Sequence, residues 1–504
     1  MSNTGTSCTA SGGWSGSKAA TGTASVTPTA SGSVTYTLTC SGGTYGGSTA
    51  ASATLTVTAA TSFSATSLVS DTAGGRALLT DANVINPWGI AFGPTSSSWV
   101  ANNHSGTSTL YDGNGRSQPA AAPLVLRFGA SDGVGFNPTG VVYNESTDFA
   151  VSAAGKTGPA LFVFSGEGGM VAGWSPSVDP GHVVTMYTDA GGAVYKGLAG
   201  ANNGIGNFLY ASDFHNAKVD TFDAAFVRQA PSSTRFGFID PTLPAGYAPF
   251  GIQALKTGAG GSVEIFVTYA LTSRPDNHNN VNGKGLGLVD VFDTNGKFLR
   301  HLIPVGRRLN APWGLALAPG DFGTLSRQLL VGNFGDGTIA GYDPTTGVYV
   351  GTIADSGGHE FAMPGLRGIA FGNDAKNQPR NTLFYAAGTN NEANGAYGRI
   401  DAGSTPPMLN VPPVVAVTAP SGRVSGTVTV TAAAQGTISV AKVELFAGAT
   451  SLGVTKSPPY SVQWDTTTLV NGGIALTAVA TDVDGNVATS PAVSVTVASD
   501  ATNN

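Results

Sequence analysis

Two histidines follow apolar segments at matching places in this chain of 504 residues. His104 comes directly after residues 99–103, and His215 lies just beyond residues 209–213. A positioned imidazole can take a proton from a reacting group, so these two histidines are the candidate general bases. The six histidines share no metal-ligand spacing such as H-x-x-x-H, so no motif predicts zinc. The alternative is that His104 and His215 are exposed loop residues.

Oxygen-bearing side chains occupy equivalent places at the ends of four apolar segments. They are Asn102, Asp213, Asn333 and Asn390. Ca²⁺ takes about six to eight oxygen ligands at flexible geometry, and the set resembles the calcium-centred sites of lactonase-type six-bladed propellers. The resemblance implies Ca²⁺ as a cofactor, with Asp213 as the single firm carboxylate. The alternative is that these side chains only stabilise turns.

A third set of residues stands directly before six regularly spaced glycines. They are Trp88, Thr139, Lys196, Phe250, Trp313 and Arg367. If the glycines mark equivalent strands around one axis, these side chains ring that axis, where loops converge on a polar cavity. Two Trp, one Phe and two cations would form an aromatic site that accepts an anionic ligand. The alternative is axial packing that fills the tunnel.

A sequence repeat predicts the elements that would position these groups. The motif of residues 86–92 recurs with its glycine at positions 89, 140, 197, 251, 314 and 368, at spacings of 51 to 63 residues. Each copy precedes an apolar strand and a further strand that closes on an acidic turn, with no helical period between them. Four short strands in each of six units predict a six-bladed β-propeller. The glycines would let the innermost strands approach the axis, and a strand near Leu68 would complete the last blade.

The repeats also carry a family resemblance. Residues 68–71, 86–94 and 99–103, and after them residues 136–140 and 311–314, resemble a family of bacterial secreted propellers related to NHL-repeat propellers. The resemblance implies the six-bladed fold and a secreted protein. It implies no activity, because that family has no established function.

Both ends of the chain look like further modules. Residues 443–446, 458–465 and 478–482 resemble bacterial Ig-like modules, and about seven short strands around a buried Trp464 fit an Ig-like β-sandwich. Residues 7–16 and 36–40 are similar to another Ig-like module, in which two further strands normally precede the strand that bears the cysteine. We therefore expect an all-β chain of four parts. They are an Ig-like module lacking its first strands at 1–60, the six-bladed NHL-like β-propeller at 61–403, a Pro-rich linker at 404–413 and a bacterial Ig-like domain at 414–498.

Composition limits the partners and the compartment. The net charge of -6 has no Lys/Arg-rich stripe to neutralise phosphates, so we expect no nucleic acid, and no apolar run is long enough to span a bilayer. Cys8 and Cys40 are the only cysteines. We expect them to form a disulfide in an oxidising, extracellular compartment, the alternative being two buried thiols. No leader is visible, so secretion requires that one was removed upstream.

Two functions fit these features. The first is a secreted, monomeric recognition protein whose tunnel mouth binds a glycan, a peptide or a small organic ligand, or an extracellular polymer. The second is an extracellular hydrolase or lyase of the lactonase or esterase kind, which would use a cation and His104 or His215 at the same mouth. Whether the protein is an enzyme is left open by the sequence.

Overall fold

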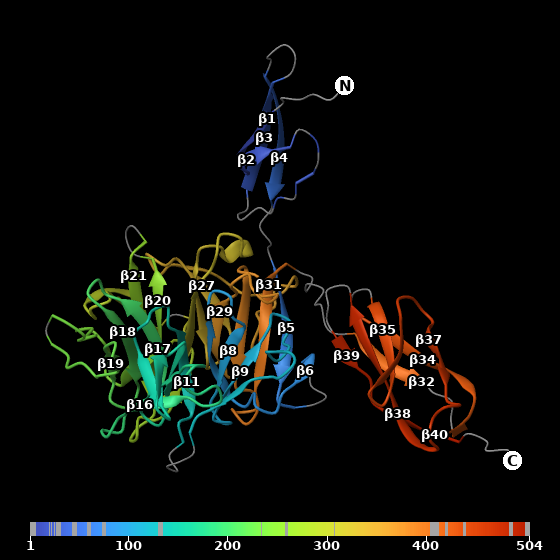
Figure 1. Cartoon of the computed structure of the whole chain (residues 1–504). Helices are drawn as coiled ribbons and strands as arrows, with labels where there is room; N and C mark the ends of the chain where they lie inside the picture. Colours follow the sequence, from blue (N-terminus) through green and yellow to red (C-terminus); the bar gives the residue numbers. More distant parts are fainter. Residues whose placement is uncertain are drawn as a thin grey trace, which may run out of the picture. The chain divides into compact units, whose positions relative to one another are not determined.

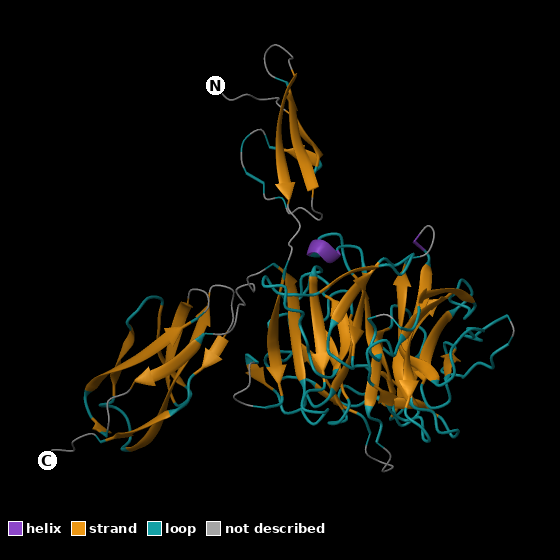
Figure 2. Ribbon diagram, turned by 180° about the vertical axis from the view of Figure 1, so that it is seen from behind, coloured by secondary structure: helices purple, strands orange, loops and turns teal. Residues whose placement is uncertain are grey.

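The structure is a computed structural model that shows an all-β chain (Figures 1 and 2). It describes residues 7–19, 21, 23–24, 26, 32–42, 48–57, 62–72, 77–129, 135–232, 234–257, 261–306, 308–403, 413–418, 422–436, 440–482 and 487–498. Residues 404–412 of the expected linker lie outside this set. The chain divides into two compact units, Met1–Pro406 and Pro407–Asn504. No helix in the described ranges has the length and apolar character needed to cross a membrane.

Six sheets follow one another through the middle of the sequence (Figure 1). The first three contain β7 (Pro87–Phe92), β8 (Ser98–Asn102), β9 (Thr107–Tyr111) and β10 (Val125–Arg127); β11 (Pro138–Tyr143), β14 (Phe162–Gly166), β15 (Met170–Trp174) and β16 (Val184–Thr188); and β17 (Tyr195–Asn202), β18 (Asn207–Asp213) and β19 (Lys218–Phe222). The fourth and fifth contain β20 (Tyr247–Lys256), β21 (Val263–Thr272), β22 (Asn280–Val281), β23 (Leu288–Phe292) and β24 (Phe298–Ile303); and β25 (Pro312–Leu317), β26 (Leu329–Asn333), β27 (Ile339–Tyr342) and β28 (Tyr349–Thr352). The sixth contains β29 (Leu366–Phe371), β30 (Thr382–Ala387), β31 (Ala396–Ala402), β5 (Phe63–Ser70) and β6 (Leu79–Thr80). A separate hairpin joins β12 (Ala150–Ala153) to β13 (Lys156–Pro159), and one 3₁₀ helix, η2 (Gly323–Leu325), precedes β26.

The repeat glycines lie where the first strands of neighbouring sheets meet. A Cβ atom added to Gly251 would lie 2.0 Å from the carbonyl oxygen of Trp313, and one added to Gly368 would lie 2.3 Å from that of Trp88. The predicted close approach of the backbones at these glycines is therefore confirmed. Because Gly368 belongs to the sixth sheet and Trp88 to the first, the first strands form a closed ring, which is the arrangement of a β-propeller.

The ring is closed by strands from the two ends of the propeller sequence. β5 pairs antiparallel with β31, and Val69 lies opposite Tyr397 in the register. Figure 1 shows β5, in blue, beside β31, in orange. This confirms that the segment near Leu68 completes the last sheet. An edge that would otherwise be exposed is covered.

Cys8 and Cys40 form the expected disulfide in a sheet of order β2-β1-β3-β4. Its strands are β1 (Ser7–Gly12), β2 (Gly16–Lys18), β3 (Gly32–Ser41) and β4 (Ser48–Val57). The two cysteines lie directly opposite each other on the paired strands β1 and β3. The bridge thus joins strands within one sheet, and this sheet is all that the described residues of the module form. An Ig-like origin of the module stays a prediction.

The second unit is a sandwich of two sheets. One contains β32 (Val414–Thr418), β34 (Thr427–Gln435) and β37 (Tyr460–Asp465). The other contains β33 (Arg423–Val424), β35 (Val440–Ala447), β36 (Thr450–Thr455), β38 (Gly472–Asp482), β39 (Val487–Thr489) and β40 (Val493–Val497). Trp464 is buried in the apolar core between them, as the alternating strands predicted.

Candidate functional site

Aromatic side chains from the first strands meet across the propeller axis. The ring centre of Trp88 lies 5.9 Å from that of Trp313 and 6.5 Å from that of Phe250, in edge-to-face arrangements. The indole nitrogen of Trp313 donates a hydrogen bond of 2.9 Å to the carbonyl oxygen of Lys196. These residues come from the first, third, fourth and fifth sheets, so the alternation of side chains along each strand has turned them toward one axis.

Each of the two axial cations has a glutamate as its partner. The ammonium of Lys196 forms an ion pair with Glu167, and the guanidinium of Arg367 lies 3.0 Å from a carboxylate oxygen of Glu392. The two cations are only 3% and 2% exposed. The expectation of an anion-accepting ring therefore needs correction, because carboxylates already neutralise both positive charges.

The electrostatics of this pairing appear in the pKa values. Burial disfavours ionisation of Glu167, but the charge and hydrogen bond of Lys196, together with Asn103 and Arg367, outweigh it, and the pKa of Glu167 falls below its usual value. Burial lowers the pKa of Lys196. Burial also lowers the pKa of Arg367 to about 10, which leaves its guanidinium charged at neutral pH. Lys196 and Glu167 thus stabilise each other's charge in a site with little water.

Arg367 lies between two aromatic rings. Its guanidinium carbon is 3.5 Å from the ring centre of Trp88 and 4.0 Å from that of Phe334. Such contacts stabilise a buried cation through the negative faces of the rings. The Nε and Nη1 groups of Arg367 have no hydrogen-bond partner. The two rings, Glu392 and the nearby charge of Glu167 therefore compensate for burying this charge.

Four residues that contact the axial cations or their glutamate partners directly follow the second strand of their sheet. Asn103 follows β8, Glu167 follows β14, Phe214 follows β18 and Phe334 follows β26. The predicted calcium ligands Asn102, Asp213 and Asn333 each stand one residue earlier in three of these sheets, and their side chains point the other way because strand side chains alternate. These four residues could have been identified from their place in the sequence, one residue beyond the second strand of each sheet. Glu167 went unnoticed because the strand before it was not recognised as equivalent to the others.

An open cavity of about 480 Å³ lies at this end of the propeller. It is lined by Asn279, Asn280, Asn282, Phe334, Gly335, Asp336, Pro364, Gly365, Gly388, Asn391 and Glu392. Phe334 and Glu392 connect this cavity to the aromatic rings, cations and glutamates at the propeller axis, here called the axial cluster, since both contact Arg367. Its charged side chains are two carboxylates, so the cavity offers amides, carboxylates and one aromatic face.

Neither candidate general base lines this cavity. His104 is exposed, in accordance with the loop alternative. The Nδ1 atom of His215 lies 2.8 Å from the carbonyl oxygen of Asp276, which fixes the imidazole in a loop. The structure places no described histidine among the lining residues.

The candidate calcium ligands serve the turns at the strand ends. One oxygen of Asp213 accepts the backbone N–H groups of Val194 and Asn216, and the other accepts the Asn216 amide. The ammonium of Lys218 lies 3.3 Å from Asp213 and 2.5 Å from Asp220, so the two carboxylates share one cation. Asn333 accepts the N–H of Asn310.

The other two candidates are likewise engaged. Asn102 donates to the hydroxyls of Thr107 and Thr109, and Asn390 donates to Asn394. These contacts fit turn stabilisation better than a calcium site, although the oxygen of Asn102 has no hydrogen-bond partner. Calcium at these residues stays a prediction, and no chemistry is derived from it.

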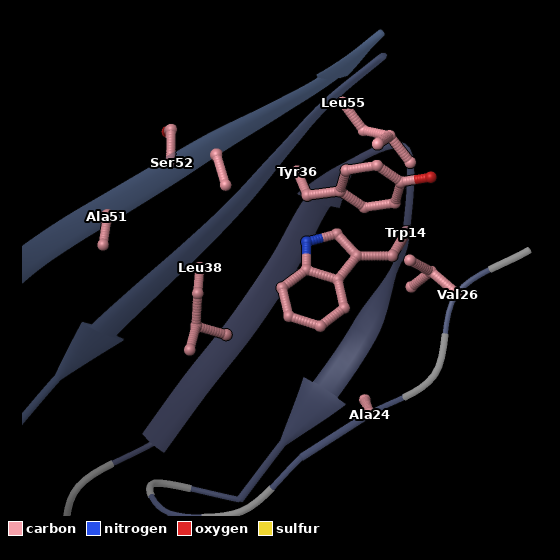
Figure 3. Close-up of a pocket in the computed structure, with 9 residues that line it drawn as sticks. Trp14, Ala24, Val26, Tyr36, Leu38, Ala51, Ser52 and Leu55 are labelled. Atoms are coloured by element: carbon pink, nitrogen blue, oxygen red, sulfur yellow. The ribbon is translucent and has the colours of Figure 1, made fainter. Parts of the chain in front are cut away.

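Two further cavities differ in character. One of about 360 Å³ includes Tyr143, Asn202 and Asn207, at the opposite ends of the strands. The other, of about 380 Å³, lies on the N-terminal sheet, where Trp14 and Tyr36 stand beside Leu38 (Figure 3). That surface is almost entirely apolar and holds no charged residue. The cavity beside Phe334 combines polar groups with contact to the axial cluster, so it is the better candidate.

Comparison with known proteins gives matches in both units. The Big_7 family, a bacterial Ig domain, matches residues 413–478. The uncharacterized protein R648 of Acanthamoeba polyphaga mimivirus is 31% identical over 329 residues, covering 64% of this chain and 77% of that protein. The uncharacterized protein L690 of the same virus is 31% identical over 300 residues, covering 58% and 74%. These relatives are viral, so the bacterial source implied by the sequence resemblance stays a prediction.

Similar solved structures include other propeller proteins. A streptogramin B lyase is 12% identical with a TM-score of 0.34, covering 67% of this chain and 97% of that one. The Dos1 propeller is 12% identical with a TM-score of 0.33, covering 80% and 95%. TM-scores this low carry no inference about what the chain binds or does.

Proposed function

Since the chain belongs to the same family as the mimivirus proteins R648 and L690, whose names assign no activity, we propose its function from the cavity beside Phe334. The protein is proposed to bind a neutral, polyhydroxylated ligand, a segment of glycan, at this cavity. The six sheets act as the six blades of one propeller, whose loops hold the ligand. The observation that carries the proposal is the composition of the cavity lining.

The lining suits hydroxyl groups better than anions or apolar ligands. Asn279, Asn280, Asn282 and Asn391 can each both donate and accept hydrogen bonds, and Asp336 and Glu392 accept them. Phe334 offers an aromatic face against which the C–H face of a sugar ring can pack. An anion would meet two carboxylates, while Arg367, the cation that contacts Phe334 and Glu392, is buried.

The axial cluster holds part of the cavity lining in place. The guanidinium of Arg367 contacts Phe334 and pairs with Glu392, so two lining side chains are held by the same buried group. The amide of Asn86 donates a hydrogen bond of 2.9 Å to the second oxygen of Glu392. A cavity whose lining is held in place loses less conformational entropy on binding.

We assign the binding protein to the extracellular space and expect it to act as a monomer. The disulfide and the bacterial Ig domain fit an oxidising, extracellular setting. The alternative of a hydrolase or lyase is weaker, because neither His104 nor His215 lines the cavity.

Calorimetric titration with neutral oligosaccharides from cellulose, xylan, chitin and mannan tests the proposal. At least one of them should bind, and Asn391→Ala should weaken that binding about tenfold through a lost hydrogen bond. Asn202→Ala, a matched change in the cavity at the opposite ends of the strands, should leave the affinity unchanged. Binding that responds to Asn202→Ala and not to Asn391→Ala would place the site elsewhere. Turnover of any of these sugars would favour the enzyme.

A further inference from the structure

Two buried aspartates and a histidine meet at the third and fourth strands of the fourth sheet, away from the axis. Asp290 lies in β23, and His301 lies directly opposite it in β24. Asp240 comes from the segment between β19 and β20. The side chains of the two aspartates are fully buried, whereas that of His301 is 28% exposed. The cluster therefore faces the interior and has one side open to solvent.

The ligand atoms of these three side chains converge on one place. The Nδ1 atom of His301 lies 2.6 Å from Oδ1 of Asp290 and 3.4 Å from Oδ2 of Asp240, and the three residues offer atoms within 4.8 Å of one another. Neither of these two pairs has the geometry of a hydrogen bond. Both oxygens of Asp290, Oδ2 of Asp240 and Nδ1 of His301 are buried without a hydrogen-bond partner. Such orphaned polar atoms are rare in folded proteins and call for an unseen partner.

The charge of the cluster points to the nature of that partner. In the ion pairs of the described residues, the imidazole of His301 is the only basic group near the two carboxylates. The neighbouring Arg300 is engaged by Glu264, at 2.9 and 2.8 Å. Two buried carboxylates in contact need either a shared proton or a cation.

We propose that Asp240, Asp290 and His301 bind a divalent transition-metal cation, Zn²⁺ or Mn²⁺. Two carboxylates balance the charge of the ion, and the imidazole favours transition metals over Ca²⁺ and Mg²⁺. Asp240 is already oriented, because its other oxygen accepts the N–H of Thr242 at 2.8 Å and its hydroxyl at 2.7 Å. Carboxylate ligands of metal ions are held by such outer contacts.

The bound ion would link the long segment between β19 and β20 to the fourth sheet. The third sheet has three strands, and the chain between β19 and β20 crosses to the fourth sheet instead of adding another strand. Phe236 and Phe238 in this connection donate backbone hydrogen bonds to Asn295 and Gly296, although their φ angles of 61° and 46° are left-handed. Residues other than glycine rarely adopt this backbone conformation unless the surrounding structure holds them in it. A metal joining Asp240 to β23 and β24 supplies one, and this role does not depend on ligand binding at the axial cavity.

The test uses the full chain, purified without a histidine tag and stripped with EDTA. Exposure to a mixture of Zn²⁺, Mn²⁺, Ca²⁺ and Mg²⁺ should load one equivalent of Zn²⁺ or Mn²⁺, measured by elemental mass spectrometry. At a concentration of that metal about a hundred times its Kd, the Tm of the propeller should rise by about 4 °C. Trypsin cleavage after Arg228 and Arg235 should slow by at least tenfold.

Two variants separate this site from general effects on folding. Asp290→Asn keeps the shape of the side chain and should abolish metal uptake, the rise in Tm and the protection from trypsin, while the metal-free protein folds at least as stably. Asp223→Asn, in the same connection but outside the cluster, should keep all three responses. A wild-type protein that takes up no transition metal, prefers Ca²⁺ or Mg²⁺, or loses its metal only in Asp223→Asn would overturn the proposal.

Discussion

Arg367 holds its guanidinium carbon 3.5 Å from the ring centre of Trp88, although 278 residues separate the two in the sequence. Arg367 belongs to the sixth sheet and Trp88 to the first, so this cation–π contact crosses the point at which the ring of sheets closes. The same guanidinium pairs with Glu392 at the lining of the candidate cavity. One buried charge thus contacts both the junction of the first and sixth sheets and the lining of the cavity.

Replacement of this charge tests its contribution to stability. Arg367→Ala removes the partner of Glu392 and leaves a void beside Trp88, so the free energy of unfolding should fall by about 3 kcal/mol. Urea unfolding followed by tryptophan fluorescence measures the change. Arg380→Ala, which removes an exposed guanidinium paired with Asp374, should have little effect. Equal effects of the two changes would contradict a special role of the axial contact.

A second prediction concerns Gly251, where the backbones of two neighbouring first strands approach each other most closely. Gly251→Ala would place a methyl group 2.0 Å from the carbonyl oxygen of Trp313, so the first strands of the fourth and fifth sheets must separate. The free energy of unfolding should fall by about 3 kcal/mol or more, measured by urea denaturation. Gly181→Ala is the matched control, since its methyl group would meet only Asp179 at 3.8 Å. A tolerated Gly251→Ala would show that the ring can widen without cost.

The ion pair of Lys196 and Glu167 predicts how stability depends on pH. The pKa of Glu167 is lower in the folded protein than in the unfolded chain, because Lys196, Asn103 and Arg367 together outweigh the effect of burial. The unfolded chain therefore binds the proton first as the pH falls. The stabilisation is fully present above the unfolded pKa of about 4.3 and is lost as the pH drops through the folded value.

Thermal unfolding of the wild type and of Glu167→Gln between pH 3 and pH 7 measures this effect. The wild type should be the more stable protein near pH 7, and the difference should shrink toward pH 3. A difference that stays constant with pH would mean that the charge of Glu167 contributes nothing.

The cross-strand disulfide predicts a local effect in the N-terminal sheet. Joint replacement Cys8→Ser and Cys40→Ser frees a loop with a sequence separation of 32 and should lower the stability of this sheet by about 2–4 kcal/mol. Faster hydrogen exchange in β1 and β3, with unchanged exchange in β7 and β20, is the expected readout. Reducing agent should reproduce the change in the wild type and add nothing in the variant. An effect that spreads to β7 and β20 would argue against a local role.

The sequence by itself predicted the repeating elements because their cause is local. Period-2 apolar strands, the six glycines and the closing strand near Leu68 all depend on residues close together in the chain or on a motif that recurs. Gly251 could be identified because no other residue fits where two backbones meet. Trp464 could be assigned to a core from the alternation of its own strand.

The tertiary structure alone decided what the axial residues do. The sequence brought Trp88, Lys196, Phe250, Trp313 and Arg367 to one ring. The partner of Lys196, Glu167, follows a strand of another sheet, and the partner of Arg367, Glu392, lies in a loop of the same sheet 25 residues further along, so no local pattern connects them. Whether a cation is free for a ligand depends on those long-range contacts, because burial of a charge is stable only beside its counter-charge. The cluster of Asp240, Asp290 and His301 depends in the same way on a connection that crosses between sheets. Its three side chains become one site only when this connection packs against the fourth sheet.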